Sequence, residues 1–70
     1  MSQFLIGKNL RLELFKKGMS QEEFGEQIGY SQGTVSLIVT NKKGVTMKEI
    51  GDFAKVLQVK TDVLLSSQND

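Results

Sequence analysis

The charged side chains of this 70-residue chain are the groups most able to bind a ligand or take part in a reaction. Nine lysines and arginines stand against eight aspartates and glutamates, so the formal net charge is only +1. Many of the cations fall in two segments with a carboxylate cluster between them: Lys8, Arg11, Lys16 and Lys17, then Glu22, Glu23 and Glu26, then Lys42 and Lys43. Clustered cations can hold phosphates, so the distribution of charge favours an anionic partner more than the sum does. An ordinary solvated surface is the alternative interpretation.

Catalysis fits this composition poorly. The chain has no histidine and no cysteine, which removes the commonest general base and the thiolate ligands. No carboxylate pair suggests a cleft, so we expect neither an enzyme nor a metal or cofactor. No apolar run approaches the ~20 residues of a membrane span, and the N-terminus lacks a signal-peptide pattern. A cytoplasmic protein of a bacterium or a phage is therefore expected.

The elements that position these groups are clearest between residues 21 and 40. Apolar residues three or four apart give each half of this segment one buried face: Phe24 and Ile28, then Val35 and Ile38. Gly29 lies between the halves, where a left-handed backbone is needed, and Gly25 is small where two helices would cross closely. Two helices joined by a short glycine turn form the helix-turn-helix motif, whose second helix enters the DNA major groove.

Capping residues favour the same helix boundaries. Ser20 and Glu23 form a capping box ahead of the first helix, and Ser31 can cap the second. An ordinary helical hairpin with a glycine turn is the alternative. The small residue, the turn glycine, both caps and the apolar spacing together favour the helix-turn-helix.

Supporting helices account for the rest of the chain. The apolar spacing predicts a helix over 6–17 that ends before Gly18, with Leu5, Leu12 and Phe15 as a second apolar flank. Thr46 and Glu49 form another capping box, and a short final turn begins at Thr61. We predict an all-α fold of five helices around one core, a single domain over residues 1–65, and a polar tail over 66–70 that frays.

The segments IGKNLRLELFKKGMSQEEFGEQIGYSQGTVSLIVTNKKG and IGDFAKVLQV resemble the lambda-repressor-like DNA-binding family, the Cro and repressor domains of temperate phages. The resemblance covers residues 6–65, and GMSQEEF followed by IGYSQGTVS is its most specific part. It implies that the second and third of five helices form the motif, that the third enters the major groove, and that dimers bind palindromic operators.

The resemblance also implies which side chains face the bases: Ser31, Gln32, Gly33, Ser36 and Leu37. Gln32 matches a glutamine whose amide can pair with adenine N6 and N7. Gly33 can only permit close approach or leave a base unread. Leu37 would suit a thymine methyl, with a simple packing contact as the alternative.

Phosphate contacts are implied for a second set of residues: Gln21, Arg11, Thr40, Asn41, Lys42 and Lys43. Gln21 resembles the glutamine that opens the second helix, and the two lysines resemble a basic loop after the third helix. Double-stranded DNA is thus the expected partner, with no cofactor.

Several positions depart from the family pattern. Leu14 and Val39 stand where many members form an ion pair, a change that costs little because apolar residues can replace a buried pair. Asn41 and Gln58 stand where glycine is common. Glu13 occupies a position that is commonly apolar, so the rotation of the first helix is left open.

The expected function is sequence-specific DNA binding that represses transcription by occluding an operator. Dimer contacts are expected near the C-terminal end, from Val59, Val63, Leu64 and Leu65, although capping of the core can explain at least half of them. The alternative is a protein-interaction module, a phage modulator or antitoxin-like domain whose main partner is another protein.

Overall fold

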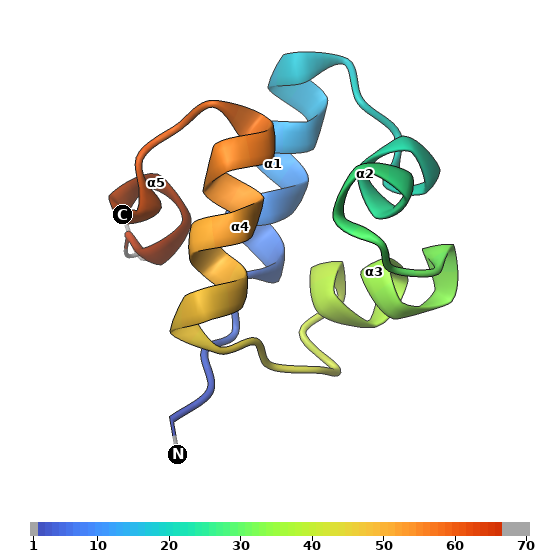
Figure 1. Cartoon of the computed structure of the whole chain (residues 1–70). Coiled ribbons are helices and arrows are strands. Elements are labelled where there is room, and N and C mark those ends of the chain that lie inside the picture. The colour runs from blue at the N-terminus through green and yellow to red at the C-terminus, as the bar shows by residue number, and fades with distance from the viewer. Residues whose placement is uncertain (1, 67–70) are drawn as a thin grey trace.

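Five helices make up the fold in the computed structural model, which describes residues 2–66. In chain order they are α1 (Gly7–Lys17), α2 (Gln21–Ile28), α3 (Gln32–Val39), α4 (Met47–Leu57) and α5 (Thr61–Leu65). α2 and α3 lie on one side of α4 and α5 lies on the other (Figure 1). The prediction of an all-α fold with five helices is confirmed.

The described residues contain no strand, but the N-terminal segment is tied down by a single antiparallel bridge. The backbone N–H of Phe4 donates to the Val45 carbonyl at 2.8 Å, and the N–H of Val45 donates to the Phe4 carbonyl at 2.9 Å. Of the predicted tail, residues 67–70 lie outside the described residues. Ser66 is described, and its carbonyl accepts a 2.8 Å hydrogen bond from Asn9 Nδ2.

Both predicted capping boxes form. The Ser20 hydroxyl accepts from the Glu23 N–H at 3.0 Å while the Ser20 N–H donates to the Glu23 carboxylate at 2.9 Å. Thr46 and Glu49 make the same reciprocal pair at 3.2 and 2.8 Å. These bonds satisfy backbone donors that a helix leaves unpaired in its first turn, which is why α2 and α4 begin where the sequence predicted.

Left-handed residues end three of the helices and open the loop after α3. The φ angles are 64° at Gly18, 82° at Gly29, 61° at Asn41 and 57° at Gln58. Asn41 and Gln58 thus adopt the conformation that a glycine commonly supplies at these places, which asparagine tolerates better than most residues.

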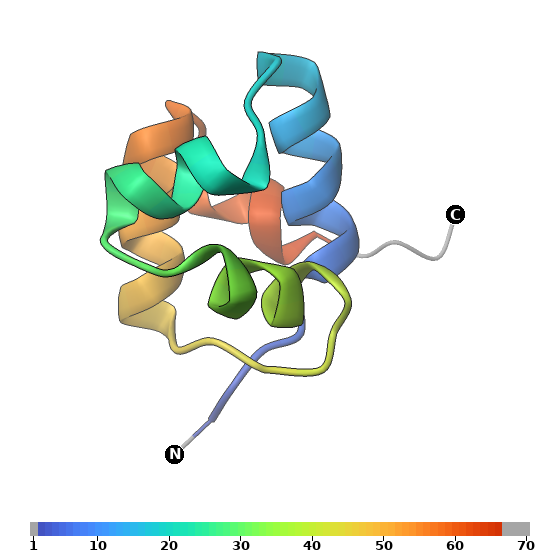
Figure 2. The ribbon, with the colours of Figure 1, turned by 90° about the vertical axis from the view of Figure 1, so that its right-hand side faces the viewer.

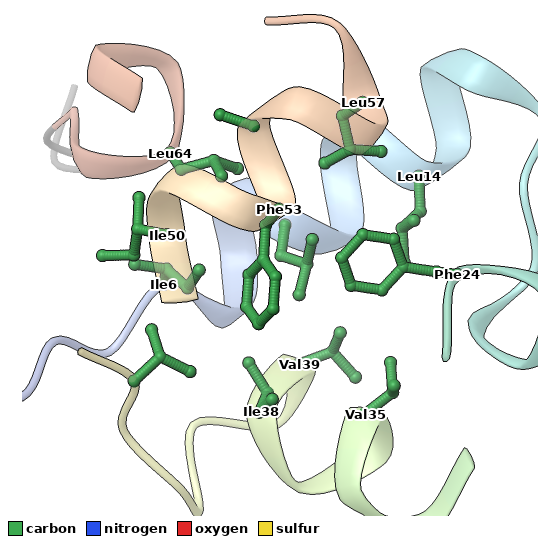
Figure 3. Packing of buried hydrophobic residues seen from close by; sticks show 13 residues of the cluster. Ile6, Leu14, Phe24, Val35, Ile38, Val39, Ile50, Phe53, Leu57 and Leu64 are labelled. Carbon is green, nitrogen blue, oxygen red and sulfur yellow. The ribbon is translucent and has the colours of Figure 1, made fainter. Parts of the chain in front are cut away.

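One apolar core joins all five helices (Figure 3). The Phe53 ring of α4 meets the rings of Phe24 and Tyr30 edge-on, with centroid distances of 5.2 and 5.8 Å. This arrangement is favourable because the positive edge of one ring faces the negative face of another. The buried cluster comprises Ile6, Leu10, Leu14, Phe24, Val35, Ile38, Val39, Val45, Ile50, Phe53, Ala54, Leu57 and Leu64.

Two glycines allow the helices to approach closely. A Cβ added at Gly25 would lie 2.6 Å from the Tyr30 carbonyl oxygen and 3.3 Å from Val35 Cγ2, which confirms the predicted close crossing of α2 and α3. A Cβ at Gly7 would lie 2.5 Å from the Val39 carbonyl oxygen. The N-terminus of α1 therefore rests directly on the end of α3, an approach that the sequence did not predict.

The structure settles the rotation of α1. Glu13 is buried with 5% of its surface exposed, whereas Phe15 is 83% exposed. Leu14 and Val39, which depart from the pattern of the family that the sequence resembles, are both buried in the core. The Glu13 carboxylate lies 3.4 Å from Lys16 Nζ, so its charge is paired at the edge of the helix.

Candidate nucleic-acid interface

The turn between α2 and α3 is held by its own backbone. The N–H groups of Gly29 and Tyr30 both donate to the Gly25 carbonyl at 2.8 Å, which closes the end of α2. α3 then begins directly after Ser31, because the Ser31 hydroxyl accepts from the Thr34 N–H at 3.2 Å. Figure 2 shows the result, with α3 below α2 and the chain that follows α3 passing beneath it.

Tyr30 anchors this turn to α4. Its hydroxyl donates a hydrogen bond to the Glu49 carboxylate, the same group that completes the capping box with Thr46. Burial, followed by this hydrogen bond, raises the pKa of Tyr30 to about 12. Burial alone would raise the pKa of Glu49 as well, but hydrogen bonds from Tyr30 and Thr46 outweigh it and hold that pKa below its usual value. The sequence offered only the capping-box role of Glu49 as a signal.

One side of α3 is fully buried and the opposite side is exposed. Val35 and Ile38 have no exposed surface and Val39 has 4%, so these residues fix the rotation of the helix against the core. The residues expected to face bases are all exposed, and their helical spacing brings them onto one surface: Ser31, Gln32, Gly33, Ser36 and Leu37. We call these five residues the α3 outer face.

Within the α3 outer face the side chains have different capacities. Gln32, in the first turn, offers both a donor and an acceptor, and Ser36 offers a hydroxyl one turn later. The Ser31 hydroxyl already accepts from the Thr34 N–H and lies 3.0 Å from the Thr34 hydroxyl. Donation by the Ser31 hydroxyl to a base would compete with its bond to the Thr34 hydroxyl, whereas the cap would remain.

The residues that follow α3 are wound tightly against its end. The N–H groups of Lys42 and Lys43 both donate to the Leu37 carbonyl, at 2.9 and 3.1 Å. Their side chains are exposed, so two ammonium groups project from a segment whose backbone is held in place. Such a segment suits a phosphate grip, because the backbone is already ordered before binding.

Thr40 and Asn41, also expected at phosphates, have structural hydrogen bonds. Thr40 Oγ1 donates to the Ser36 carbonyl at 2.8 Å, so its proton is used within the helix. Asn41 Oδ1 accepts from the Gly7 N–H at 2.8 Å and thereby caps α1. A phosphate can only accept hydrogen bonds, so a contact from Asn41 would come from its Nδ2 group.

Gln21 and Arg11 lie outside this loop. Gln21 is the first residue of α2 and is half-buried. Arg11 is exposed and lines a shallow depression on α1 together with Lys8, Leu12 and Phe15. The structure therefore gathers the α3 outer face and the two lysines after it, and it places Arg11 on a different helix, beside apolar neighbours.

The four residues expected at a dimer contact divide by burial. Leu64 has no exposed surface, so it serves the core and cannot meet another subunit in this conformation. Its backbone carbonyl also accepts from Asn9 Nδ2 at 2.8 Å, which ties α5 to α1. Val59, Val63 and Leu65 are half-buried and retain some surface.

Residues 2–66 contain no cluster of three or more acidic, histidine or cysteine side chains placed to hold a metal ion. Across the same range, every helix is too short or too polar to cross a bilayer.

Comparisons with known proteins place this arrangement in a family. A family model described as helix-turn-helix matches residues 8–64. No curated protein sequence matches the chain significantly.

Solved structures resemble the whole fold. The hypothetical transcription factor NHTF from Neisseria is 30% identical with a TM-score of 0.83, over 91% of this chain and 74% of that one. The restriction-modification controller protein C.AhdI from Aeromonas hydrophila is 25% identical with a TM-score of 0.78, over 84% and 89%. The biofilm master regulator SinR of Bacillus subtilis, solved in complex with DNA, is 26% identical with a TM-score of 0.79, over 87% and 98%.

Proposed function

This chain belongs to the helix-turn-helix family, and we propose that, as a DNA-binding regulator of that family, it represses transcription by covering an operator. The observation that carries the proposal is the α3 outer face. Its polar side chains are exposed on a helix whose opposite side is locked in the core. We propose no catalytic step and no cofactor, and the site of action is the cytoplasm, where the DNA of a bacterium or an infecting phage lies.

The dimensions of α3 suit the major groove. An α-helix with its side chains is about 10–12 Å in diameter, which fits a major groove about 12 Å wide. In this proposal Gln32 pairs with adenine, Ser36 bonds to a neighbouring base edge, and Leu37 packs on a thymine methyl. Gly33 lets the backbone approach the groove, since nothing but the Ser31 hydroxyl lies within 4 Å of its missing Cβ.

Phosphate contacts set the register of the helix in the groove. In this proposal Lys42 and Lys43 contact the DNA backbone on one side of α3. Gln21, at the start of α2, contacts the DNA backbone on the other side. A helix N-terminus carries partial positive charge, which adds to the attraction at Gln21. Thr40 and Asn41 complete the proposed set, whereas Arg11, on α1 beside Leu12 and Phe15, is not part of it.

We propose that two copies bind one operator. A single α3 spans only a few base pairs, too little sequence for a search of a whole genome. Two copies related by a two-fold axis read half-sites about 34 Å apart. Val59, Val63 and Leu65 supply the contact between copies, and Leu64 supports them from the core.

Footprinting on selected genomic fragments tests this function. Fragments would be selected with purified protein at about 50 and 200 mM salt, because phosphate contacts make affinity fall steeply over this range. The expected result is a symmetric protected site with two proteins bound. Binding that ignores sequence at both salt concentrations, or one protein on an asymmetric site, would contradict it.

A protein-interaction module is the second candidate function. The observation that favours it is the exposed apolar surface of α1, where Leu12 and Phe15 are 47% and 83% exposed. If no DNA fragment is selected even at low salt, this candidate replaces the first.

A further inference from the structure

The solvent side of α1 carries an apolar surface that the proposed DNA contacts do not use. Leu12 and Phe15 lie three residues apart on one side of the helix, and the side chains of Lys8 and Arg11 line the same shallow depression. We call these four residues the α1 outer face.

Packing of the fold does not require Phe15. Gly7, Leu10 and Leu14 hold α1 against the core, and burying Phe15 by rotating the helix would expose the two leucines. α1 thus exposes Phe15 to solvent while it buries Glu13, which lies two residues earlier. Neighbouring exposed apolar side chains of this size are typical of interaction surfaces.

The apolar surface continues beyond α1. Lys8 also lines a second depression, which it shares with Leu5 and Leu65. Leu5 is 64% exposed, and Leu65 is half-buried. Lys8 therefore connects the α1 outer face to this depression of mixed polar and apolar lining, and the two together form one band that runs from α5 along α1.

Charge distinguishes the possible occupants of this band. All exposed charged residues of α1 are cations, namely Lys8, Arg11, Lys16 and Lys17, because the one carboxylate of the helix, Glu13, is buried against Lys16. Neither Lys8 nor Arg11 forms a salt bridge within the described residues 2–66. A second copy docked through the same surface would bring these like charges together, which is unfavourable.

Other parts of this chain do not complement the band either. The acidic surface of α2, with Glu22, Glu23 and Glu26, offers no strongly exposed apolar side chain to meet Phe15. The occupant must supply both carboxylates and apolar side chains.

We propose that the α1 outer face binds an acidic amphipathic helix of another protein. The apolar stripe of that helix covers Leu12 and Phe15, and its flanking carboxylates pair with Lys8 and Arg11. The face is small, so the complex is transient, with a micromolar dissociation constant. The surface is separate from the α3 outer face, so a partner bound there can accompany the protein on DNA.

The test uses a synthetic helical peptide of about 18 residues, with a leucine stripe flanked by glutamates, titrated into the ¹⁵N-labelled full chain. The expected result is a set of amide shift changes centred on residues 8–15, with binding that weakens as salt is raised. Phe15→Ser should weaken binding by about 10- to 150-fold, because the buried phenylalanine no longer removes apolar surface from water. Lys8→Glu should also weaken it.

Matched controls separate this surface from the rest of the molecule. Met47→Ser removes an apolar side chain that is 50% exposed at the start of α4, and it should leave peptide binding unchanged. A peptide with lysines in place of the glutamates should not bind. Phe15→Ser should bind DNA as the unaltered protein does.

Three results would overturn the proposal. If the lysine peptide bound as well as the glutamate peptide, the charge of the partner would not contribute to binding. A sedimentation mass that falls in Phe15→Ser would assign the face to a second copy of the chain. If the unaltered protein did not bind the peptide and Phe15→Ser lost DNA affinity, the α1 outer face would be a DNA contact instead.

Discussion

The α3 outer face and the α1 outer face are both exposed helix surfaces over the same core, yet they differ in chemistry. On α3 the exposed residues are mostly short and polar, with Leu37 as the one large apolar side chain. On α1 an exposed leucine and phenylalanine lie between cations. Polar groups on a rigid helix can hydrogen-bond to base edges, whereas an apolar surface gains free energy only when something covers it. The two helices are therefore suited to different partners.

The two phenylalanines Phe24 and Phe15 give the largest expected contrast. Phe24 of α2 is fully buried with its ring against Phe53, so Phe24→Ala should lower the free energy of unfolding by about 3–5 kcal/mol. Phe15→Ala should change it by no more than about 0.5 kcal/mol, because the side chain is already in solvent. Thermal and denaturant unfolding measure both, and a large loss in Phe15→Ala would mean that α1 is packed differently.

Gln32 tests the α3 outer face itself. Gln32→Ala should cost about 1–3 kcal/mol in operator binding and leave unfolding nearly unchanged, because the side chain is exposed without DNA. Val35→Ala is the matched control from the same helix. It should lower thermal stability through a cavity in the core, with no direct loss of a base contact. Unchanged operator affinity in Gln32→Ala would remove this residue from the interface.

Lys42 and Lys43 should act on all DNA sequences alike. If each lysine neutralises one phosphate, the double change to alanine should reduce the slope of log affinity against log salt by roughly 0.9 per residue. Titrations at several salt concentrations, on operator and random DNA, give this slope. Lost specificity with an unchanged slope would show that these lysines do not contact the backbone.

Tyr30→Phe tests how the hydrogen bond between Tyr30 and Glu49 holds the turn before α3 in place. Losing a hydrogen bond to a charged carboxylate should cost about 1–3 kcal/mol of stability near neutral pH. The pKa of Glu49 is lowered in the fold, so its contribution is present above the unfolded pKa and is lost as pH falls through the folded one. The difference between Tyr30→Phe and the unaltered protein should therefore shrink in acid. A difference that is constant with pH would exclude Glu49 as the partner.

Much of the helix-turn-helix was predictable because its signals are local. Ser20 with Glu23 and Thr46 with Glu49 place two helix starts within four residues of sequence each, and Gly29 marks the turn. The same holds for the α3 outer face, since the buried Val35 and Ile38 fix by helical period which side chains point outward.

Contacts between distant residues were the part that the sequence did not reveal. The Asn41 bond to Gly7 joins residues 34 apart, and the Asn9 bonds to Leu64 and Ser66 join residues 55 and 57 apart. Each uses a polar side chain that local pattern assigns to a surface. For Asn41 the structure adds the cap of α1 through Oδ1 to the phosphate contact that is proposed for its Nδ2 group.

By itself the sequence determined the number of helices, their ends and the buried side of α3, because caps, left-handed residues and apolar spacing act within one or two turns. Only the tertiary structure decided that Glu13 faces inward and Phe15 outward, that Leu64 lies wholly in the core, and that Tyr30 binds Glu49. The periodicity of α1 admits two apolar sides, and which one is buried depends on Gly7 resting against α3 and Asn9 holding α5. That choice is made by packing between helices, which no local pattern encodes.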